Sequence, residues 1–316
     1  MLFLTEEEVG QLLTMKDAIR EVEAALRAMG EGKVEVRPRQ RVRMPHALLH
    51  IMPAGWPDRG YFGFKYYSST RKRTRFWFHL FDAETGDLVA VIQADRLGQQ
   101  RTGAASGVAT KYLAPEDASI VGIIGTGWQA ESQLEAVCAV RGIETVRCFG
   151  RDRAAREAFA KKMAAELGID VRAVDSAEAA ARGADIVVTA TNASQPVLHG
   201  EWLEPGAHVN AIGSNRLEAR EVDDEVVKRS AFIAVDLIEQ AKIECGDLAA
   251  PIARGLLRWD RVHELGDVVA GRVKGRTHPE DITLFKSHGI AIEDVAVAAF
   301  VYGRARKERM GQELSL

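Results

Sequence analysis

The sequence predicts two domains of mixed α/β structure. One is a doubly wound parallel sheet, and the other is an α+β domain in which helices flank an antiparallel sheet. Apolar and polar residues alternate with period two through much of residues 34–92, which is typical of half-buried strands. After Ala114-Pro115, short apolar strands alternate with helical stretches, which is typical of a parallel sheet. The length of 316 residues suits two domains.

Composition excludes several classes of protein. Hydrophobic residues make up 47% and charged residues 28% of the chain, so it is neither disordered nor collagen-like. A net charge of -3 gives no global attraction to nucleic acid or membrane lipid. Its 3 cysteines lack a CxxC spacing, which disfavours a disulfide framework or a zinc site. We expect a cytoplasmic protein with no signal peptide, membrane span or metal.

The first domain begins with a helix over residues 15–29. Thr14 and Asp17 resemble a capping box before it, and Gly30 follows it. Strands are expected around residues 34–36, 42–44, 48–52 and 61–67. A hairpin then joins residues 76–81 to residues 88–92 through a polar turn.

The second domain alternates strands and helices. The expected strands cover residues 118–124, 145–149, 186–190, 207–212 and 231–235. Helices are expected over residues 129–140 and 153–167. Residues 290–310 form a last, long helical pattern with a basic end.

A glycine-rich turn follows the first strand of the second domain. Gly125 permits a tight turn, Gly127 lets backbone N–H groups approach a pyrophosphate, and Ala130 lets the next helix pack closely on the strand. The phosphate charge would then lie at the helix N-terminus. This pattern predicts a Rossmann-type dinucleotide site, which also includes Thr126, Trp128 and Gln129.

The end of the second strand of this domain bears on the choice of cofactor. NAD sites usually carry an acidic residue there, but this chain has Gly150, followed by Arg151, whose guanidinium suits a 2′-phosphate. The pattern favours NADP over NAD. Asp152 keeps NAD open, and Arg151 has the alternative interpretation of a solvated loop charge.

Two cations of the first domain are candidates for substrate binding. Lys65 lies in an apolar and aromatic strand, where its ammonium needs an anion or a path to water. Arg101 precedes a run of small residues, at an expected helix start suited to gripping a carboxylate. Taken alone, each is also explained as a structural charge. Among the histidines, none of which forms a metal motif, His50 merits attention because it lies in a strand.

Together these motifs resemble the ornithine cyclodeaminase/mu-crystallin family. The resemblance runs in order over nearly the whole chain. It includes residues 64–65, 101–106, 125–130, 210–213, 235–236 and 282–287, of which RTGAAS at 101–106 and ITLFKS at 282–287 are the most specific.

The resemblance implies a homodimer and a discontinuous substrate-binding and dimerisation domain. That domain would comprise residues 1–113 with 291–316, and the dinucleotide-binding domain residues 114–290. Lys65 and Asp236 would be catalytic, and Arg101 would bind the substrate carboxylate. A second carboxylate-binding arginine is expected among the alternating Arg37, Arg39, Arg41 and Arg43, with Arg39 and Arg41 as candidates. Further cofactor contacts are expected from Thr102, Thr191, Gly213, Ser214 and Ser287.

The family resemblance leaves several chemistries open. We expect an NAD(P)-dependent enzyme that transfers hydride at the α-carbon of a small amino or imino acid, as a cyclic ketimine reductase or an amino-acid dehydrogenase. Ornithine cyclodeaminase is the alternative. It is weakened because His50-Ile51-Met52-Pro53 lacks the acidic residue that this resemblance implies before Met-Pro. A second alternative is an NADPH-dependent ligand-binding protein. Nucleic-acid binding through the basic run at residues 71–75 is disfavoured because no recognition motif surrounds it.

Overall fold

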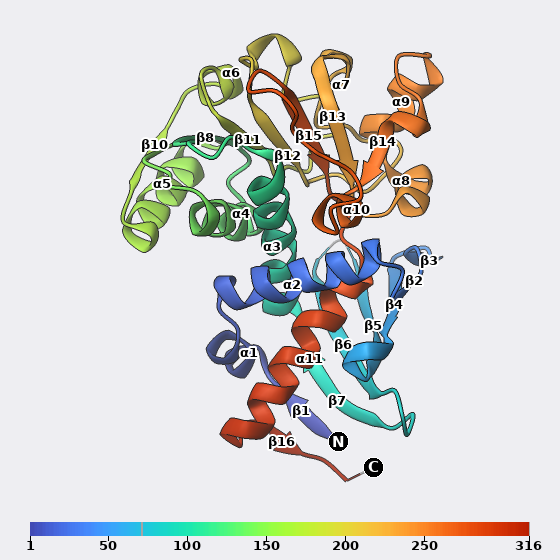
Figure 1. Ribbon diagram of the computed structural model, residues 1–316. Coiled ribbons are helices and arrows are strands. Elements are labelled where there is room, and N and C mark those ends of the chain that lie inside the picture. The colour runs from blue at the N-terminus through green and yellow to red at the C-terminus, as the bar shows by residue number, and fades with distance from the viewer. Residues whose placement is uncertain (71, 316) are drawn as a thin grey trace. The chain divides into compact units, whose positions relative to one another are not determined.

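The computed structural model describes residues 1–70 and 72–315 and divides the chain into two compact units (Figure 1). Unit 1 comprises Met1–Ala105 and Gly289–Leu316, and unit 2 comprises Ser106–His288. The first division falls inside helix α3 (Asp95–Leu113), eight residues before the position expected from the sequence. The second falls just before helix α11 (Ala291–Glu308).

Unit 1 is built on a sheet of strand order β16-β1-β7-β6-β5-β4-β2, with β3 also paired to β4. The expected antiparallel pairing is present from β2 to β7, but β1 pairs with β7 in parallel, so the sheet is mixed. The strands are β1 (Leu2–Leu4), β2 (Glu35–Val36), β3 (Gln40–Arg43), β4 (Leu48–Trp56), β5 (Tyr61–Ser69), β6 (Thr74–Asp82), β7 (Leu88–Gln93) and β16 (Gln312–Glu313).

Three helices complete unit 1 beside α3: α1 (Glu6–Leu12), α2 (Met15–Gly30) and α11. The Thr14 side chain caps α2 by accepting from Asp17 N, as the sequence predicts. Figure 1 shows α11, in red, lying beside α2, with which it packs, as it does with β4 and β5. Alternation along β4 buries His50 and Met52 on one face of the sheet, and the paired residues of β5 are Tyr67 and Lys65.

Unit 2 is built on a fully parallel sheet of order β10-β9-β8-β11-β12-β15-β13-β14. This confirms the doubly wound fold. Its strands are β8 (Ile120–Ile124), β9 (Thr145–Phe149), β10 (Asp170–Ala173), β11 (Ile186–Thr189), β12 (His208–Ala211), β13 (Ser230–Val235), β14 (Val262–Glu264) and β15 (Ile282–Lys286). Its helices are α4 (Trp128–Val140), α5 (Arg153–Leu167), α6 (Ala177–Ala181), α7 (Asp224–Arg229), α8 (Ile238–Glu244), α9 (Gly246–Ala253) and α10 (Leu265–Val269).

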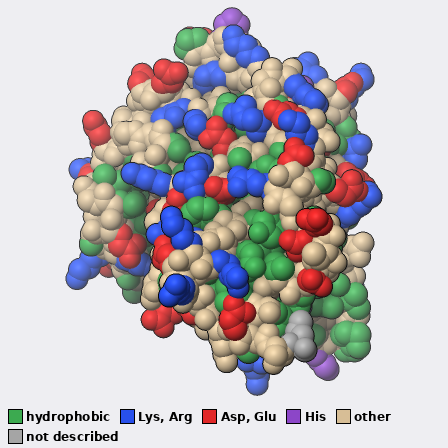
Figure 2. Space-filling model, turned by 60° about the horizontal axis from the view of Figure 1, so that its bottom comes forward, with side chains coloured by type: hydrophobic (Ala, Val, Ile, Leu, Met, Phe, Trp, Pro, Cys, Tyr) green, Lys and Arg blue, Asp and Glu red, His purple; other side chains and the backbone are tan. Residues whose placement is uncertain are grey.

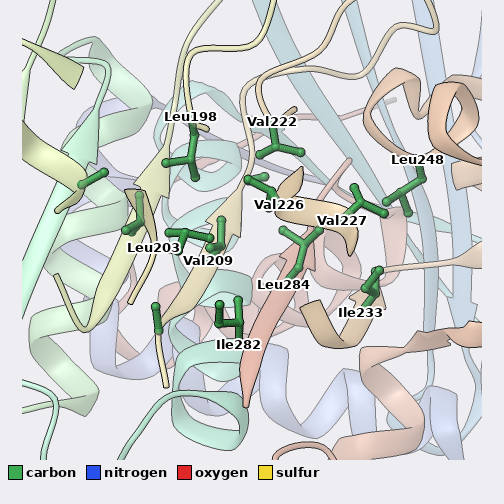
Figure 3. Packing of buried hydrophobic residues seen from close by; sticks show 14 of the residues in the cluster. Leu198, Leu203, Val209, Val222, Val226, Val227, Ile233, Leu248, Ile282 and Leu284 are labelled. Carbon is green, nitrogen blue, oxygen red and sulfur yellow. The ribbon is translucent and has the colours of Figure 1, made fainter. Parts of the chain in front are cut away.

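Both faces of this parallel sheet are buried. Val188 of β11 packs in a cluster with Leu134 of α4 and Phe159 of α5. Its neighbour Val187 belongs to a second cluster, which includes Val226 of α7 (Figure 3). Successive residues of a strand point to opposite faces, so a parallel strand covered on both sides is apolar throughout.

Candidate active site

Lys65 is enclosed in unit 1, with its side chain only 1% exposed. It lies in β5 opposite Met52, and its ammonium donates to Asp294 Oδ1 at 2.9 Å. Burial and the Arg101 and Arg39 guanidiniums lower the pKa of Lys65 to about 7, although Asp294 opposes them. An amine with this pKa is present in both protonation states at neutral pH, so it can accept or donate a proton.

Arg101 is held by the first turn of α11. Its Nε donates to the same Asp294 oxygen at 2.9 Å, and its Nη1 donates to Glu293 Oε2 at 2.8 Å. Both carboxylates are fully buried. The N-terminal turn of a helix favours negative charge, and the two cations compensate the acids further. Asp294 therefore joins Lys65 to Arg101 through a single oxygen atom.

Gly289 brings a second arginine to this cluster. The Gly289 carbonyl accepts from Arg39 Nη2 at 3.3 Å, and a Cβ on Gly289 would lie 2.2 Å from Arg101 Nη1. Its φ of +72° also favours glycine. Lys65, Arg39 and Arg101 thus converge on one buried cluster. Their ammonium and guanidinium groups suit an anionic ligand with a carboxylate.

The alternating arginines do not share one environment. Arg39 is buried, Arg41 is half-buried in β3 opposite His50, and Arg37 and Arg43 are exposed. His50 stacks on Tyr67 with ring centroids 4.1 Å apart. Burial and the positive charges of Arg39, Arg41 and Arg43 lower the pKa of His50 to about 3, so its imidazole is neutral at neutral pH.

The glycine turn of unit 2 has the geometry that a dinucleotide needs. Gly125 has a φ of +111°, and a Cβ there would lie 2.2 Å from the Ala190 carbonyl oxygen. Gly127 is the N-cap of α4 and has no atom within 4 Å of where its Cβ would stand. Ala130 is fully buried. The open N-terminus of α4 therefore fits a pyrophosphate, and the residues present fit a dinucleotide cofactor.

The residues after β9 are arranged as a capped helix start. A Cβ on Gly150 would lie 2.4 Å from Thr126 Oγ1, so an acidic side chain does not fit at this position. Arg151 is exposed. Asp152 is the N-cap of α5 and accepts from Ala155 N at 2.8 Å. Its carboxylate is therefore engaged by the backbone.

Asp236 follows β13 and is 1% exposed. Its Oδ2 accepts from Ser287 Oγ at 3.2 Å and from the backbone N–H of His288. Ser287 and His288 directly follow β15, which pairs with β13 in parallel. Asp236 thus ties together the carboxyl ends of two neighbouring strands, the edge where ligands of doubly wound folds bind.

The family comparison agrees with this geometry. The model of the ornithine cyclodeaminase/mu-crystallin family matches residues 1–309. The chain belongs to this family. An alanine dehydrogenase from Archaeoglobus fulgidus is 38% identical over 99% of this chain and 98% of its own.

Two solved structures of family members cover nearly the whole chain. Delta(1)-pyrroline-2-carboxylate reductase from Thermococcus litoralis, in complex with NADH and L-proline, has a TM-score of 0.96 and 36% identity, and the match covers 99% of this chain and 100% of that one. An archaeal alanine dehydrogenase dimer with bound NAD has a TM-score of 0.94 and 36% identity, with 100% and 99% covered. The fold is therefore that of nicotinamide-binding members of the family.

The site residues expected from the family resemblance are divided between the units. Lys65, Arg39 and Arg101 meet in unit 1. Thr102 also lies in unit 1, where its hydroxyl donates to Gly98 O at 2.8 Å. The remaining expected cofactor residues lie in unit 2. The small-residue run after Arg101 is not a helix start as expected, because it lies in the middle of α3.

A buried acid was missed by sequence reasoning in unit 2. Glu221 Oε1 accepts from Thr191 N at 2.7 Å and from Thr191 Oγ1 at 2.8 Å, and Oε2 accepts from Gly213 N at 2.5 Å. It therefore holds the segments after β11 and β12 together. Ser214 lies next to them, and its hydroxyl donates to Ala219 O at 3.2 Å.

The buried ion pair of Asp247 and Lys286 contacts the backbone of Glu221 and Ser214. Asp247 Oδ1 accepts from Glu221 N at 2.6 Å and from Val222 N at 3.0 Å. Lys286 Nζ lies 3.3 Å from Asp247 Oδ2 and donates to Ser214 O at 2.7 Å. The sequence signal for these partners is weak, since isolated acids in loops are usually exposed.

Three further expectations concern a metal site, a membrane span and the basic run at residues 71–75. Within residues 1–70 and 72–315, no group of His, Cys, Asp or Glu side chains is arranged to hold a metal ion. No helix in that part of the chain is long and apolar enough to span a membrane. In the basic run at residues 71–75, residue 71 lies outside the described residues, and Lys72 and Arg73 are exposed. Figure 2 shows Lys and Arg side chains interspersed with Asp and Glu on the face it presents.

Proposed function

We propose that this chain is an NAD(P)-dependent oxidoreductase that transfers hydride at the α-carbon of a small amino or imino acid. The observation that carries the proposal is the buried cluster in which Lys65 and Arg101 share one oxygen of Asp294. Buried cations with a perturbed lysine are a signature of functional sites. The fold supports the proposal, since it matches structures that bind NADH or NAD.

Arg101 and Arg39 are proposed to bind the substrate α-carboxylate. Both guanidiniums lie next to Gly289 in the buried cluster of unit 1. Arg101 is already held on its Nε and Nη1 sides by acids, which fixes the plane of its guanidinium. A preoriented guanidinium loses little entropy when it binds a carboxylate. Arg41 is the less favoured candidate because it is only half-buried.

Lys65 is proposed to exchange a proton with the substrate nitrogen. Its pKa of about 7 places it near the optimum for proton transfer at neutral pH. In the reductive direction the nitrogen of a C=N bond gains a proton as its carbon gains a hydride. In the oxidative direction the amine loses that proton to the lysine.

The residues of unit 2 are proposed to bind the cofactor, which when bound supplies or accepts the hydride. The turn at Gly125 and Gly127 would hold the pyrophosphate at the start of α4. Thr191, Gly213, Ser214 and Ser287 would line the nicotinamide end. Asp236 would stabilise the positive charge that develops on the substrate as the C=N bond forms.

We propose NADP(H) as the preferred cofactor. Gly150 cannot be replaced by an acid without displacing Thr126, and Arg151 next to it is exposed. The carboxylate of Asp152 caps α5 and is thus less suited to bind ribose hydroxyls. An exposed arginine beside the site suits a 2′-phosphate.

A reductase or dehydrogenase is favoured over ornithine cyclodeaminase. A cyclodeaminase must accommodate the second ammonium of its substrate. The resemblance implies an acidic residue just before Met52-Pro53 for this ammonium, but the chain has His50-Ile51 there. His50 is buried, and burial and three nearby arginines keep its imidazole neutral. A positive potential opposes the binding of a substrate ammonium.

We propose that the chain forms a homodimer through the outer face of the unit 1 sheet. Phe62 is 41% exposed and stacks on Phe81 at 5.2 Å, while Phe64 meets the edge of His79 at 5.0 Å. Exposed aromatic patches are typical of interfaces. Phe62→Asp is expected to convert the dimer into a monomer, measured by light scattering after size exclusion. Glu84→Gln, in an exposed turn, is the control and is expected to leave the dimer intact.

We also propose a cytoplasmic location, since all three cysteines are free thiols.

The function is tested with purified protein and a panel of substrates. Cyclic ketimines, and pyruvate with ammonia or methylamine, are assayed with NADPH and with NADH by the loss of absorbance at the reduced nicotinamide band. L-Ornithine is assayed with NAD and detection of proline. We expect NADPH-dependent reduction of an imine. Proline formation without net cofactor consumption would instead establish a cyclodeaminase, and ligand binding without turnover of any substrate would establish a binding protein.

A further inference from the structure

One network at the carboxyl edge of the parallel sheet in unit 2 contains more negative than positive charge. Glu221 and Asp247 supply two carboxylates and Lys286 supplies one ammonium, and all three side chains are fully buried. Glu221 and Asp247 directly precede Val222 and Leu248, which belong to the hydrophobic cluster of Figure 3. The charges are therefore placed against an apolar core, where screening by water and salt is weak.

The hydrogen bonds match ionised carboxylates. Glu221 accepts three hydrogen bonds, and Asp247 accepts two from backbone N–H groups beside the Lys286 ammonium. An ionised carboxylate only accepts, so each of these donors is matched. Burial by itself lowers the pKa of Lys286, but the Asp247 and Glu221 carboxylates outweigh burial and raise its pKa above the ordinary value.

The network lies directly behind the segments assigned to the cofactor. Glu221 binds Thr191 and Gly213, and Lys286 binds the Ser214 carbonyl. Asp236 accepts from the hydroxyl of Ser287, the residue that follows Lys286. Glu221 and Lys286 are thus hydrogen-bonded directly to the backbone of these segments.

We propose that the network of Glu221, Asp247 and Lys286 favours the oxidised, cationic nicotinamide over the reduced, neutral one. This inference rests on the proposed function, since it takes Thr191, Gly213 and Ser214 as the nicotinamide-lining segments. The two forms of the cofactor differ by one positive charge on the ring, and a fixed negative charge behind it interacts only with the charged form. Stabilising the oxidised product in this way favours hydride delivery to an imine. Glu221 is thus a positioning residue with an additional electrostatic effect.

The test compares the dissociation constants of NADP⁺ and NADPH, measured by calorimetry at pH 8 without substrate. Glu221→Gln removes one buried negative charge. We expect it to weaken NADP⁺ relative to NADPH by about fivefold, because a buried unit charge acts on the cationic ring and not on the neutral one. The matched control is Glu178→Gln, which neutralises an exposed acid of the same unit.

Lys286→Met provides the opposite change. Removing the ammonium increases the negative excess, so we expect NADP⁺ to gain relative to NADPH. If Glu221→Gln does not fold, the change in relative NADP⁺ and NADPH affinity of Lys286→Met tests the inference by itself. A purely structural role predicts equal weakening of both forms in both variants, and that result would overturn the inference. If the unmodified protein binds neither cofactor form, nor NAD⁺ or NADH, the proposed function itself fails.

Discussion

Lys65 Nζ lies 2.9 Å from Asp294 Oδ1, although the two residues are 229 positions apart in the chain. The pair connects a strand at the centre of the unit 1 sheet with the first turn of α11. Burial and the neighbouring arginines lower the pKa of Lys65, whereas the Asp294 carboxylate raises it.

Lys65→Met is expected to abolish turnover and to leave cofactor affinity unchanged. Methionine fills most of the buried volume but can neither bind nor release a proton. The measurement is steady-state reduction of the best substrate in the panel, with NADPH binding followed by calorimetry. Lys33→Met, which alters an exposed lysine of the same unit, serves as the control. Normal turnover by Lys65→Met would remove Lys65 from the mechanism.

Asp294→Asn is expected to move the pH profile toward lower pH. Asp294 raises the pKa of Lys65, so its neutralisation lets burial and the arginines lower that pKa below about 7. The limb of the pH profile that reports the pKa of Lys65 moves to lower pH whether Lys65 acts as an acid or as a base. The variant also leaves Arg101 with one acid, at a cost of about 3–5 kcal/mol in the free energy of unfolding. An unchanged limb, in protein shown to be folded by circular dichroism, contradicts the coupling.

Arg151→Ala is expected to weaken NADPH by about tenfold and to leave NADH unaffected. A guanidinium bound to a phosphate contributes about 1.5–3 kcal/mol to the binding free energy. Because Arg151 is exposed, we expect a contribution at the lower end of this range. Dissociation constants for both cofactors provide the measurement. Arg153→Ala is the matched control, since Arg153 is exposed and paired with Glu157. Equal loss for both cofactors, or none for either, would count against the 2′-phosphate assignment.

His208→Gln is expected to make the protein less sensitive to acid. His208 lies between Thr283 Oγ1 and Asn210 Oδ1, at 2.8 and 3.2 Å, and burial with Arg276 nearby lowers its pKa to about 3. Below pH 6.5 the unfolded chain binds a proton that the folded chain does not, so stability falls with pH down to about 3. Where the unfolded chain is protonated, below about pH 6, removing His208 should reduce this slope by about 1.4 kcal/mol per pH unit. Urea unfolding between pH 4 and 6 measures the slope, and an unaltered slope would show that His208 does not cause this acid sensitivity.

Local patterns in the sequence predict the main strands and helices of both units. Period-two alternation predicted β4 to β7, and the glycine turn before α4 predicted the dinucleotide fold, because these signals are local. Strand β1 (Leu2–Leu4) is not predicted by the sequence. It has only three residues, and its pairing with β7 depends on residues almost ninety positions away. Such pairing is not written in local periodicity.

Only the folded chain shows which charges act together. Spacing left Arg39 and Arg41 equivalent, but only Arg39 is buried and bound to the Gly289 carbonyl. Asp294 and Glu221 carry no motif, and each becomes recognisable only when the fold buries it beside distant donors. Burial makes an unpaired charge costly, so buried acids and cations must find one another. Because charges are buried only in the folded chain, the pairing that brings the candidate site together cannot be predicted from local sequence.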